Sequence, residues 1–297
     1  MAETSAIAIR TLLSHRDVDF MIDNWSTLVS CNRDPFTTVV HDDGSLTSTD
    51  IEKITSRIPS SRVLRKPDAD EIMQQKLAAH PHARAFRAKQ VWGIKLLDIV
   101  LAEPGHCYYA DSDIRFLRPF RGLFTEDTVA GRCAFLRDEV WMAYSIRPWH
   151  LSRWFDRRGL RVVEGINTGL TIIDQSRFDL DFVDWFLAQP DWEVIPAWVE
   201  PTCWAALAVR ANGHAIDPTQ LTNLYPSAAV GPETVGVHLL SAYRKHFHSL
   251  LEQAPTLQMP CVDIRLQSLG VSGPWKFSCN QIGRKIRNEI DRRSTHV

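Results

Sequence analysis

The first hundred residues alternate short apolar runs with segments whose apolar residues recur every three or four positions. Residues 6–13 and 36–40 are apolar runs typical of strands, and residues 17–29 between them have helical spacing. Further helical patterns follow at 47–57 and 68–79. Strands and helices in this alternating order predict a mostly parallel sheet with helices on both faces. We therefore expect an α/β fold.

The segment 107–116, Cys-Tyr-Tyr-Ala-Asp-Ser-Asp-Ile-Arg-Phe, carries the strongest functional signal. A helical pattern at 89–101 and a Pro-Gly turn precede it, so Asp111 and Asp113 would stand at the carboxyl end of a strand, where open α/β sheets bind ligands. Two carboxylates there suit Mg²⁺ or Mn²⁺, which in turn bridges phosphate oxygens. An isolated Asp-x-Asp is more often a solvated turn, because 23% of the residues are charged. The prediction therefore depends on the helix, turn and strand around it.

Three motifs in this order resemble nucleotide-sugar glycosyltransferases of the GT-A fold, most closely the retaining group of glycogenin and the bacterial lipopolysaccharide galactosyltransferases. The first is Tyr-Ala-Asp-Ser-Asp-Ile at 109–114, and the second is Asn167-x-Gly169 before a strand that ends in Asp174. The third is His238 after an apolar strand. The resemblance spans roughly residues 5 to 250. It implies a GT-A type fold, with a Rossmann-like nucleotide-binding half and an acceptor-side half.

The resemblance also implies a metal-dependent transferase that moves a sugar from a nucleoside diphosphate sugar, a UDP-sugar in that group, to a hydroxyl acceptor with retention. Asp111, Asp113 and His238 would hold Mn²⁺ or Mg²⁺ against the diphosphate. Asn167 and Gly169 would line the donor sugar. The acceptor would be a glycan, a lipid-linked group or a protein.

Two segments depart from the family pattern. Glu200 opens the sequence Glu-Pro-Thr-Cys-Trp, where the family often has an Asp-Gln-Asp helix start. We assign Glu200 and Asn167 to the catalytic site, Glu200 either stabilising an oxocarbenium-like centre or accepting the acceptor's proton. After His238 the family's glycine- and lysine-containing segment is absent, so phosphate contacts would fall to Arg244 or Lys245.

Several of these residues have simpler explanations. Asp42 follows the second predicted strand and could meet a ribose or base, but an ordinary Asp-Gly turn explains the segment as well. Asn167 and Gly169 suit a sugar pocket, since Asn donates and accepts hydrogen bonds and Gly permits close backbone approach, yet a plain turn would use them too. A lone histidine such as His238 in an apolar strand is more often a core residue than a metal ligand.

Composition limits the remaining classes. With 297 residues and 44% hydrophobic content, we expect one domain over 1–275 and a basic tail or helix over 276–297. The net charge of −1 argues against nucleic-acid binding. No signal-peptide pattern or apolar window of about 20 residues is present, so we expect a cytoplasmic protein. The six scattered cysteines do not predict a zinc site.

Two regions leave alternatives open. The segment 276–297 has six basic residues against two acidic ones, which fits either contact with an anionic membrane or a solvated helix face. Tryptophans 141, 149 and 154 lie in a Trp- and Arg-rich region that could bind a glycan or form helix core.

Two other functions compete with a transferase. A sugar-nucleotide pyrophosphorylase usually has a Gly-rich loop after its first strand, and residues 10–16 contain no glycine. A non-catalytic glycan- or protein-binding module on a degenerate transferase fold would tolerate loss of both aspartates without losing nucleotide affinity.

Overall fold

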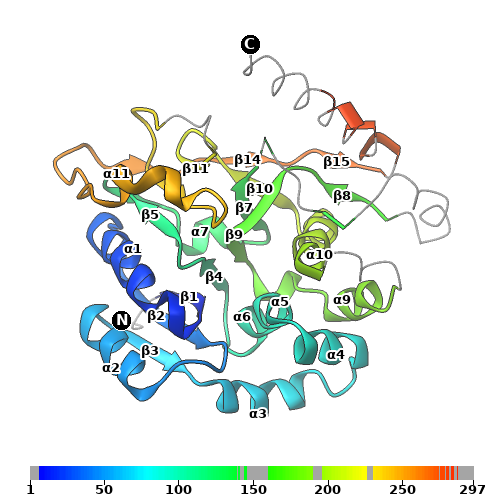
Figure 1. Cartoon of the computed structure of the whole chain (residues 1–297). Helices are drawn as coiled ribbons and strands as arrows, with labels where there is room; N and C mark the ends of the chain where they lie inside the picture. The colour runs from blue at the N-terminus through cyan, green and yellow to red at the C-terminus, as the bar shows by residue number, and fades with distance from the viewer. Residues whose placement is uncertain are drawn as a thin grey trace, which may run out of the picture.

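An eight-stranded sheet forms the centre of the protein (Figure 1). The structure is a computed structural model that describes residues 7–138, 140, 144, 145, 160–189, 196–225, 230–273, 275–277, 279, 280, 282, 283 and 286. In spatial order the strands are β14 (Leu266–Ser268), β10 (Gly213–Ile216), β7 (Cys133–Arg137), β9 (Ile166–Ile173), β4 (Cys107–Ala110), β1 (Ile7–Leu13), β2 (Phe36–Asp42) and β3 (Ser61–Leu64). Four neighbouring pairs are parallel and three, two of them made by β9, are antiparallel. The predicted α/β class with a mostly parallel sheet is confirmed.

Helices cover both faces of this sheet. The α-helices are α1 (Val18–Cys31), α2 (Ser48–Arg57), α3 (Lys66–Lys76), α4 (Pro81–Lys89), α5 (Val91–Gly93), α6 (Ile99–Leu101), α7 (Glu126–Val129), α9 (Leu180–Leu187), α10 (Pro196–Arg210) and α11 (His248–Leu251). A π-helical turn, η2 (Ile94–Asp98), joins α5 to α6, and short 3-10 helices are η1 (His15–Asp17), η4 (Gln175–Arg177) and η6 (Arg244–Phe247).

The two faces have separate apolar cores, as the two-residue period of a strand requires. On β4, Tyr108 packs into the core beneath α1 and α2, whereas Tyr109 packs into the core beneath α3 to α6, α9 and α10. Each core is closed by a buried tryptophan, Trp25 on α1 and Trp204 on α10. The carboxyl end of β4 is therefore held rigidly from both sides.

A small sheet brings a distant segment to this end of β4. It consists of β11 (Leu221–Asn223), β12 (Gly236–His238) and β5 (Ile114–Phe116). Antiparallel pairing sets His238 opposite Ile114, and the Leu239 amide donates to the Asp113 carbonyl at 2.9 Å. The remaining strand pairs are β6 (Phe120–Arg121) with β13 (Val262–Asp263), and β8 (Val162–Val163) with β15 (Val271–Ser272).

The predicted elements of the first half are present, with differences at their boundaries. Strand β3 and helix α4 were not predicted, and Gln90, in an extended conformation, separates α4 from the rest of the predicted 89–101 helix. The prediction that Asn167 and Gly169 precede their strand was wrong, because β9 already begins at Ile166. Pairing with β7 on one side and β4 on the other extends β9, and a shift in register between Phe135 and Leu136 accommodates the extra residues.

Some predicted features lie outside the described residues. Tryptophans 141, 149 and 154 are among them, as is most of the predicted tail at 276–297. Within the described part of the chain, no helix has the length and apolar character needed to cross a bilayer.

Candidate active site

Asp111 directly follows β4, and its carboxylate is held by two neighbours. Lys95 donates from Nζ to Oδ1 at 3.0 Å and to Oδ2 at 2.9 Å, and the Tyr109 hydroxyl donates to Oδ1. Lys95 lies in the π-helical turn, and such turns occur frequently at functional sites. Burial lowers the pKa of Lys95, but the carboxylates of Asp111 and Glu200 outweigh burial and raise it. Lys95 is therefore a buried, permanently charged ammonium beside Asp111.

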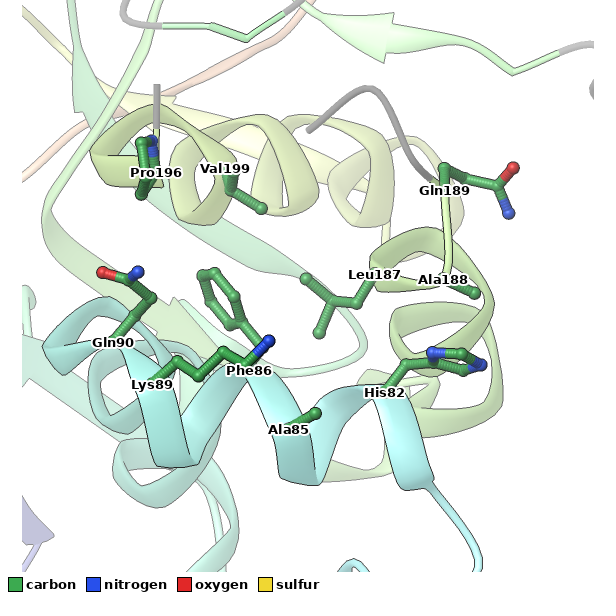
Figure 2. A pocket seen from close by; sticks show the side chains of 10 residues that line it. All are labelled: His82, Ala85, Phe86, Lys89, Gln90, Leu187, Ala188, Gln189, Pro196 and Val199. Carbon is green, nitrogen blue, oxygen red and sulfur yellow. The ribbon is translucent and has the colours of Figure 1, made fainter. Parts of the chain in front are cut away.

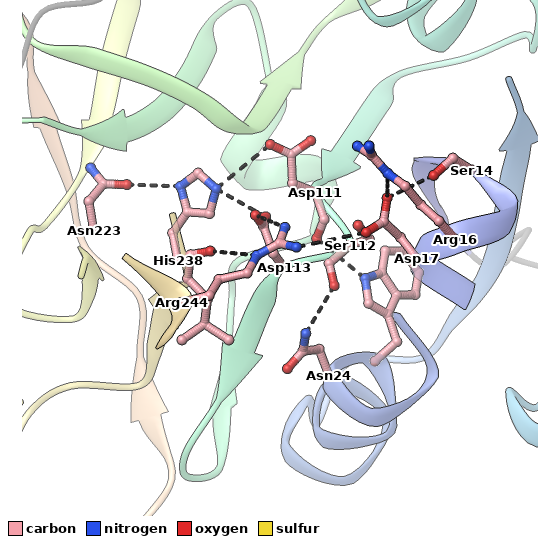
Figure 3. A network of polar contacts seen from close by, with 12 residues as sticks. Ser14, Arg16, Asp17, Asn24, Asp111, Ser112, Asp113, Asn223, His238 and Arg244 are labelled. Atoms are coloured by element: carbon pink, nitrogen blue, oxygen red, sulfur yellow. Dashed lines mark hydrogen bonds and ion pairs between the residues drawn. The ribbon is translucent and has the colours of Figure 1, made fainter. Parts of the chain in front are cut away.

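Asp113 is almost fully buried and lies between two cationic groups (Figure 3). Its Oδ1 is 3.1 Å from His238 Nε2, and its Oδ2 accepts a hydrogen bond from Arg244 Nη2 at 2.7 Å. Burial alone would raise the pKa of Asp113, but the charges of His238 and Arg244 outweigh burial and lower it to about 2. Asp113 is thus a carboxylate at every physiological pH.

His238 presents one ring nitrogen to both aspartates. Its Nε2 is 3.1 Å from Asp113 Oδ1 and 3.8 Å from Asp111 Oδ2, while Nδ1 lies 2.9 Å from Asn223 Oδ1. Burial lowers the pKa of His238, but the two carboxylates outweigh burial and raise it. Figure 3 shows Asn223, His238, Asp113 and Arg244 as one continuous chain of polar contacts.

These three side chains fit a divalent cation. One ligand atom from each of Asp111, Asp113 and His238 lies within 4.8 Å of the others. Asp113 Oδ1 is buried and makes no hydrogen bond to the described residues, so it retains lone pairs for a further partner. Two carboxylate oxygens and an imidazole nitrogen suit Mn²⁺ better than Mg²⁺, and they leave coordination positions open for other oxygen ligands.

Gly169 gives the imidazole its space. A β-carbon at this position would lie 2.4 Å from His238 Cε1, closer than any side chain tolerates. The Gly169 amide donates to Asn167 Oδ1 at 2.8 Å, and its carbonyl accepts from the Asp111 amide at 2.6 Å. Gly169 was expected to allow close approach of the backbone to a ligand, and in the structure it allows close approach of His238, while Asn167 orders the backbone there.

Glu200 is a buried carboxyl group in the second turn of α10. Its Oε2 accepts from the Thr168 hydroxyl at 2.9 Å, and its Oε1 has no hydrogen-bond partner among the described residues. Burial raises the pKa of Glu200 to about 7, although the nearby charge of Lys95 lowers it in part. A group that titrates near neutral pH can either donate or accept a proton at physiological pH.

Two pockets meet at Asp111, Lys95 and Trp92. The β1 pocket, with a volume of about 630 Å³, lies at the carboxyl ends of β1 and β2, and its other lining residues are Leu12, Leu13, Ser14, His15, Arg16, Asp17, Asp43, Ser45, Val91 and Tyr109. The β9 pocket, of about 510 Å³, is otherwise lined by Asp138, Ile166, Asn167, Thr168, Gly169, Ala197, Trp198, Glu200, Pro201, Tyr225, His238, Leu240, Ser241, Ala242 and Tyr243. The candidate metal site thus stands between two cavities.

The structure brings six of the seven predicted site residues together. Asp111, Asn167, Gly169, Glu200 and His238 line the β9 pocket, and Asp113 contacts His238. Asp42 is not brought there. Its buried carboxylate accepts from the amides of Gly44 and Leu46 and from Arg65 Nε, the contacts of an Asp-Gly turn. Its neighbour Asp43 lines the β1 pocket in its place.

A third pocket, of about 460 Å³, lies away from these residues (Figure 2). One face of α4, the end of α9 and the start of α10 form it, with His82, Ala85, Phe86, Lys89, Gln90, Leu187, Ala188, Gln189, Pro196 and Val199 as its lining. None of the predicted site residues lines it.

Sequence reasoning did not identify Lys95, Thr168 or Asn223. Lys95 had a visible signal, because it is a lone lysine within the apolar run from Val91 to Leu101. Asn223 and Thr168 had no such signal in the sequence. Asn223 reaches His238 through the pairing of β11 with β12, and Thr168 reaches Glu200 on α10, and only the three-dimensional structure defines these contacts.

Comparisons with known proteins give remote likenesses only. No protein-family model and no curated protein matches the chain. Among solved structures, the mannosyltransferase Ktr4p from S. cerevisiae is 12% identical and has a TM-score of 0.44, with 69% of this chain matched to 66% of that one. Mouse xyloside xylosyltransferase 1 in its apo form is 12% identical over 82% of this chain and 91% of its own, with a TM-score of 0.43.

A glycosyltransferase involved in the glycosylation of the major capsid of PBCV-1 is 13% identical, with a TM-score of 0.43 over 84% of this chain and 100% of its own. With TM-scores below 0.5, these likenesses establish neither an activity nor a substrate for this chain.

Proposed function

We propose that this chain is a metal-dependent glycosyltransferase that transfers a sugar from a nucleoside diphosphate sugar to a hydroxyl acceptor. The observation that carries the proposal is the convergence of Asp111 and Asp113 with His238, from two segments far apart in the sequence, beside the β1 and β9 pockets. Few reactions need an oxygen-rich cation site between two cavities at the carboxyl edge of an α/β sheet. Transfer from a diphosphate donor is one of them, because the leaving group is an anion.

The β1 pocket is assigned to the nucleoside. It lies where the first two parallel strands end, the usual nucleotide position in α/β sheets. Asp43 is a half-buried carboxylate in its wall and is assigned to accept hydrogen bonds from ribose or base groups. A UDP donor follows from the sequence resemblance to the glycogenin and lipopolysaccharide galactosyltransferase group.

The cation, when bound, would neutralise the charge that develops on the departing diphosphate. Asp111, Asp113 and His238 would hold it, and Lys95 fixes Asp111 through hydrogen bonds to both carboxylate oxygens. Arg244 and Lys245 are the cationic side chains nearest in sequence to His238 that would meet phosphate oxygens. Together these residues would stabilise negative charge without reorganising, which is the largest contribution in many enzymes.

The β9 pocket is assigned to the donor sugar and the acceptor. Trp92, Trp198 and Tyr243 are half-buried in its wall, so aromatic faces are available for stacking on sugar rings. Asn167 would contact the donor sugar. Glu200 would either stabilise positive charge at the anomeric carbon or accept the acceptor's proton, and retention of configuration favours the first role.

Ligand-dependent thermal unfolding tests this proposal. Wild type, Asp113→Asn and the control Asp127→Asn, at an exposed position on α7, would be heated with UDP, GDP and their sugar conjugates, with and without Mn²⁺. A ligand at 100 times its dissociation constant adds about 2.7 kcal/mol to the free energy of unfolding.

We expect a Mn²⁺-dependent rise in melting temperature with one nucleotide series, present in wild type and Asp127→Asn and lost in Asp113→Asn. Absence of any nucleotide effect would contradict the proposal and favour a non-catalytic binding module.

A further inference from the structure

Asn223 is a buried amide that no sequence motif identified, and it contacts the imidazole of His238. It ends β11, and parallel pairing with β12 places it beside His238. Its Oδ1 lies 2.9 Å from His238 Nδ1. Its Nδ2 donates to the Arg137 carbonyl at 3.0 Å. The amide thus links the end of β7 to the candidate metal ligand.

This arrangement determines which way the amide faces. The Arg137 carbonyl can only accept a hydrogen bond, so the amide nitrogen of Asn223 must be the group that faces it. The amide oxygen is therefore turned toward His238. An amide oxygen can only accept, so Nδ1 of His238 must carry a proton and donate it.

The tautomer of the imidazole follows from this contact. A neutral imidazole carries one N–H, and when that proton is on Nδ1 the Nε2 lone pair is exposed. Nε2 is the atom that lies 3.1 Å from Asp113 Oδ1 and 3.8 Å from Asp111 Oδ2. The Asn223 amide therefore directs the metal-binding lone pair into the space between the two carboxylates.

Gly169 approaches the Cε1–Nδ1 edge of the ring. An atom added at its β-position would lie 2.4 Å from Cε1 and 2.7 Å from Nδ1 of His238. The ring consequently packs against the backbone of β9 while Asn223 accepts from Nδ1. Position and tautomer are thus set by two different residues.

We propose that Asn223 is a positioning residue for the metal centre, which holds His238 in the Nδ1–H tautomer with Nε2 directed at the cation. The inference rests on the proposed function, since it takes Asp111, Asp113 and His238 as the metal ligands. Removing a residue that orients a metal-binding histidine typically weakens metal affinity about 10- to 100-fold. Loss of the Asn223 oxygen should have an effect of this size.

Three variants test the proposal by Mn²⁺ titration calorimetry in the absence of nucleotide. Asn223→Leu has a similar volume but cannot accept from Nδ1, and its Mn²⁺ affinity should fall about 10- to 100-fold. Asn223→Asp loses the donor to the Arg137 carbonyl but keeps an acceptor beside Nδ1, so its Mn²⁺ affinity should not fall below that of wild type. Asn32→Leu, which removes a buried amide far from the site, should bind Mn²⁺ like wild type.

The hydrogen bond at Nδ1 is measured by ¹H–¹⁵N NMR of the imidazole in protein loaded with diamagnetic Zn²⁺, in which Nε2 faces the cation and the proton is on Nδ1. The Nδ1 proton should exchange slowly with solvent in wild type and rapidly in Asn223→Leu. Unchanged exchange or unchanged Mn²⁺ affinity in a folded Asn223→Leu would overturn the role of Asn223. Absence of Mn²⁺ binding to the wild type would instead overturn the proposed function, so the calorimetry separates these two failures.

Discussion

Replacing Gly169 by alanine tests whether the candidate site is built as described. The added β-carbon would lie 2.4 Å from His238 Cε1 and 2.9 Å from Asn167 Oδ1. The imidazole cannot move away freely, because Asn223 Oδ1 holds its Nδ1 edge and Asp113 Oδ1 lies 3.1 Å from Nε2 on the opposite edge. Forcing extra volume into a packed site costs about 1–3 kcal/mol, and losing the hydrogen bond to Asn223 costs about 1 kcal/mol more. We therefore expect Gly169→Ala to lower the free energy of unfolding by about 2–4 kcal/mol.

For a chain of 297 residues this corresponds to a fall in melting temperature of roughly 3–6 °C, since the unfolding entropy is about 2 cal/mol/K per residue. Urea unfolding would give the free energy directly. Gly231→Ala is the matched control, because its β-carbon would meet only Thr234 Oγ1, at 3.8 Å. This variant should stay within about 0.5 kcal/mol of wild type.

The cause of the destabilisation is isolated in a His238→Ala background. With the imidazole removed, the contact of 2.9 Å with Asn167 Oδ1 remains, so Gly169→Ala should still cost about 1 kcal/mol or less, which gives a coupling energy of about 2 kcal/mol between positions 169 and 238. An equal cost in both backgrounds would show that the main clash lies elsewhere than at the histidine.

Three further substitutions have defined outcomes. Lys95→Met should lower the free energy of unfolding by about 2–3 kcal/mol in urea, because it leaves the mostly buried Asp111 without its ion pair; a loss below 1 kcal/mol would contradict this. Burial raises the pKa of Glu200 from about 4.5 in the unfolded chain to about 7 in the folded protein, so between pH 4.5 and 7 the folded wild type binds one proton more than the unfolded chain. The free energy of unfolding of wild type should therefore fall by roughly 3 kcal/mol relative to Glu200→Gln between pH 4.5 and 7, and the difference should stay constant above pH 7. Parallel pH profiles of the two proteins would exclude the raised pKa. Arg244→Gln should tighten binding of Mn²⁺ alone about tenfold by calorimetry, because the guanidinium on Asp113 Oδ2 no longer places a positive charge beside the cation; weaker binding would show that Arg244 helps to assemble the site.

Local patterns in the sequence were sufficient to predict the framework of the fold and two of the three candidate ligands, Asp111 and Asp113. Strand and helix periodicities are local, and Asp111 and Asp113 directly follow the strand whose end positions them. His238 was found through the order of motifs along the chain. Its approach to Asp113 depends on pairing of β12 with β5, a contact between residues more than a hundred positions apart.

The remaining features depend on non-local geometry. The role of Gly169 follows from the imidazole that packs on it, and the strand around it extends because two neighbours pair with it. Lys95 contacts Asp111 from a π-helical turn. The helical spacing of apolar residues in the sequence does not predict that a turn is π-helical. For Asp42, the sequence is the same whether its carboxylate forms a turn or contacts a ligand. The structure distinguishes the two, because Arg65 donates a hydrogen bond to this carboxylate.

The proposed function requires that Asp111, Asp113 and His238 bind a divalent cation that holds a nucleoside diphosphate. Crystals grown with Mn²⁺ and UDP, with diffraction recorded at the manganese absorption edge, would locate that cation. We expect one strong anomalous peak within coordination distance of all three side chains, with diphosphate oxygens completing the shell. A bound nucleotide with no manganese at these residues, or manganese held at another position, would contradict it.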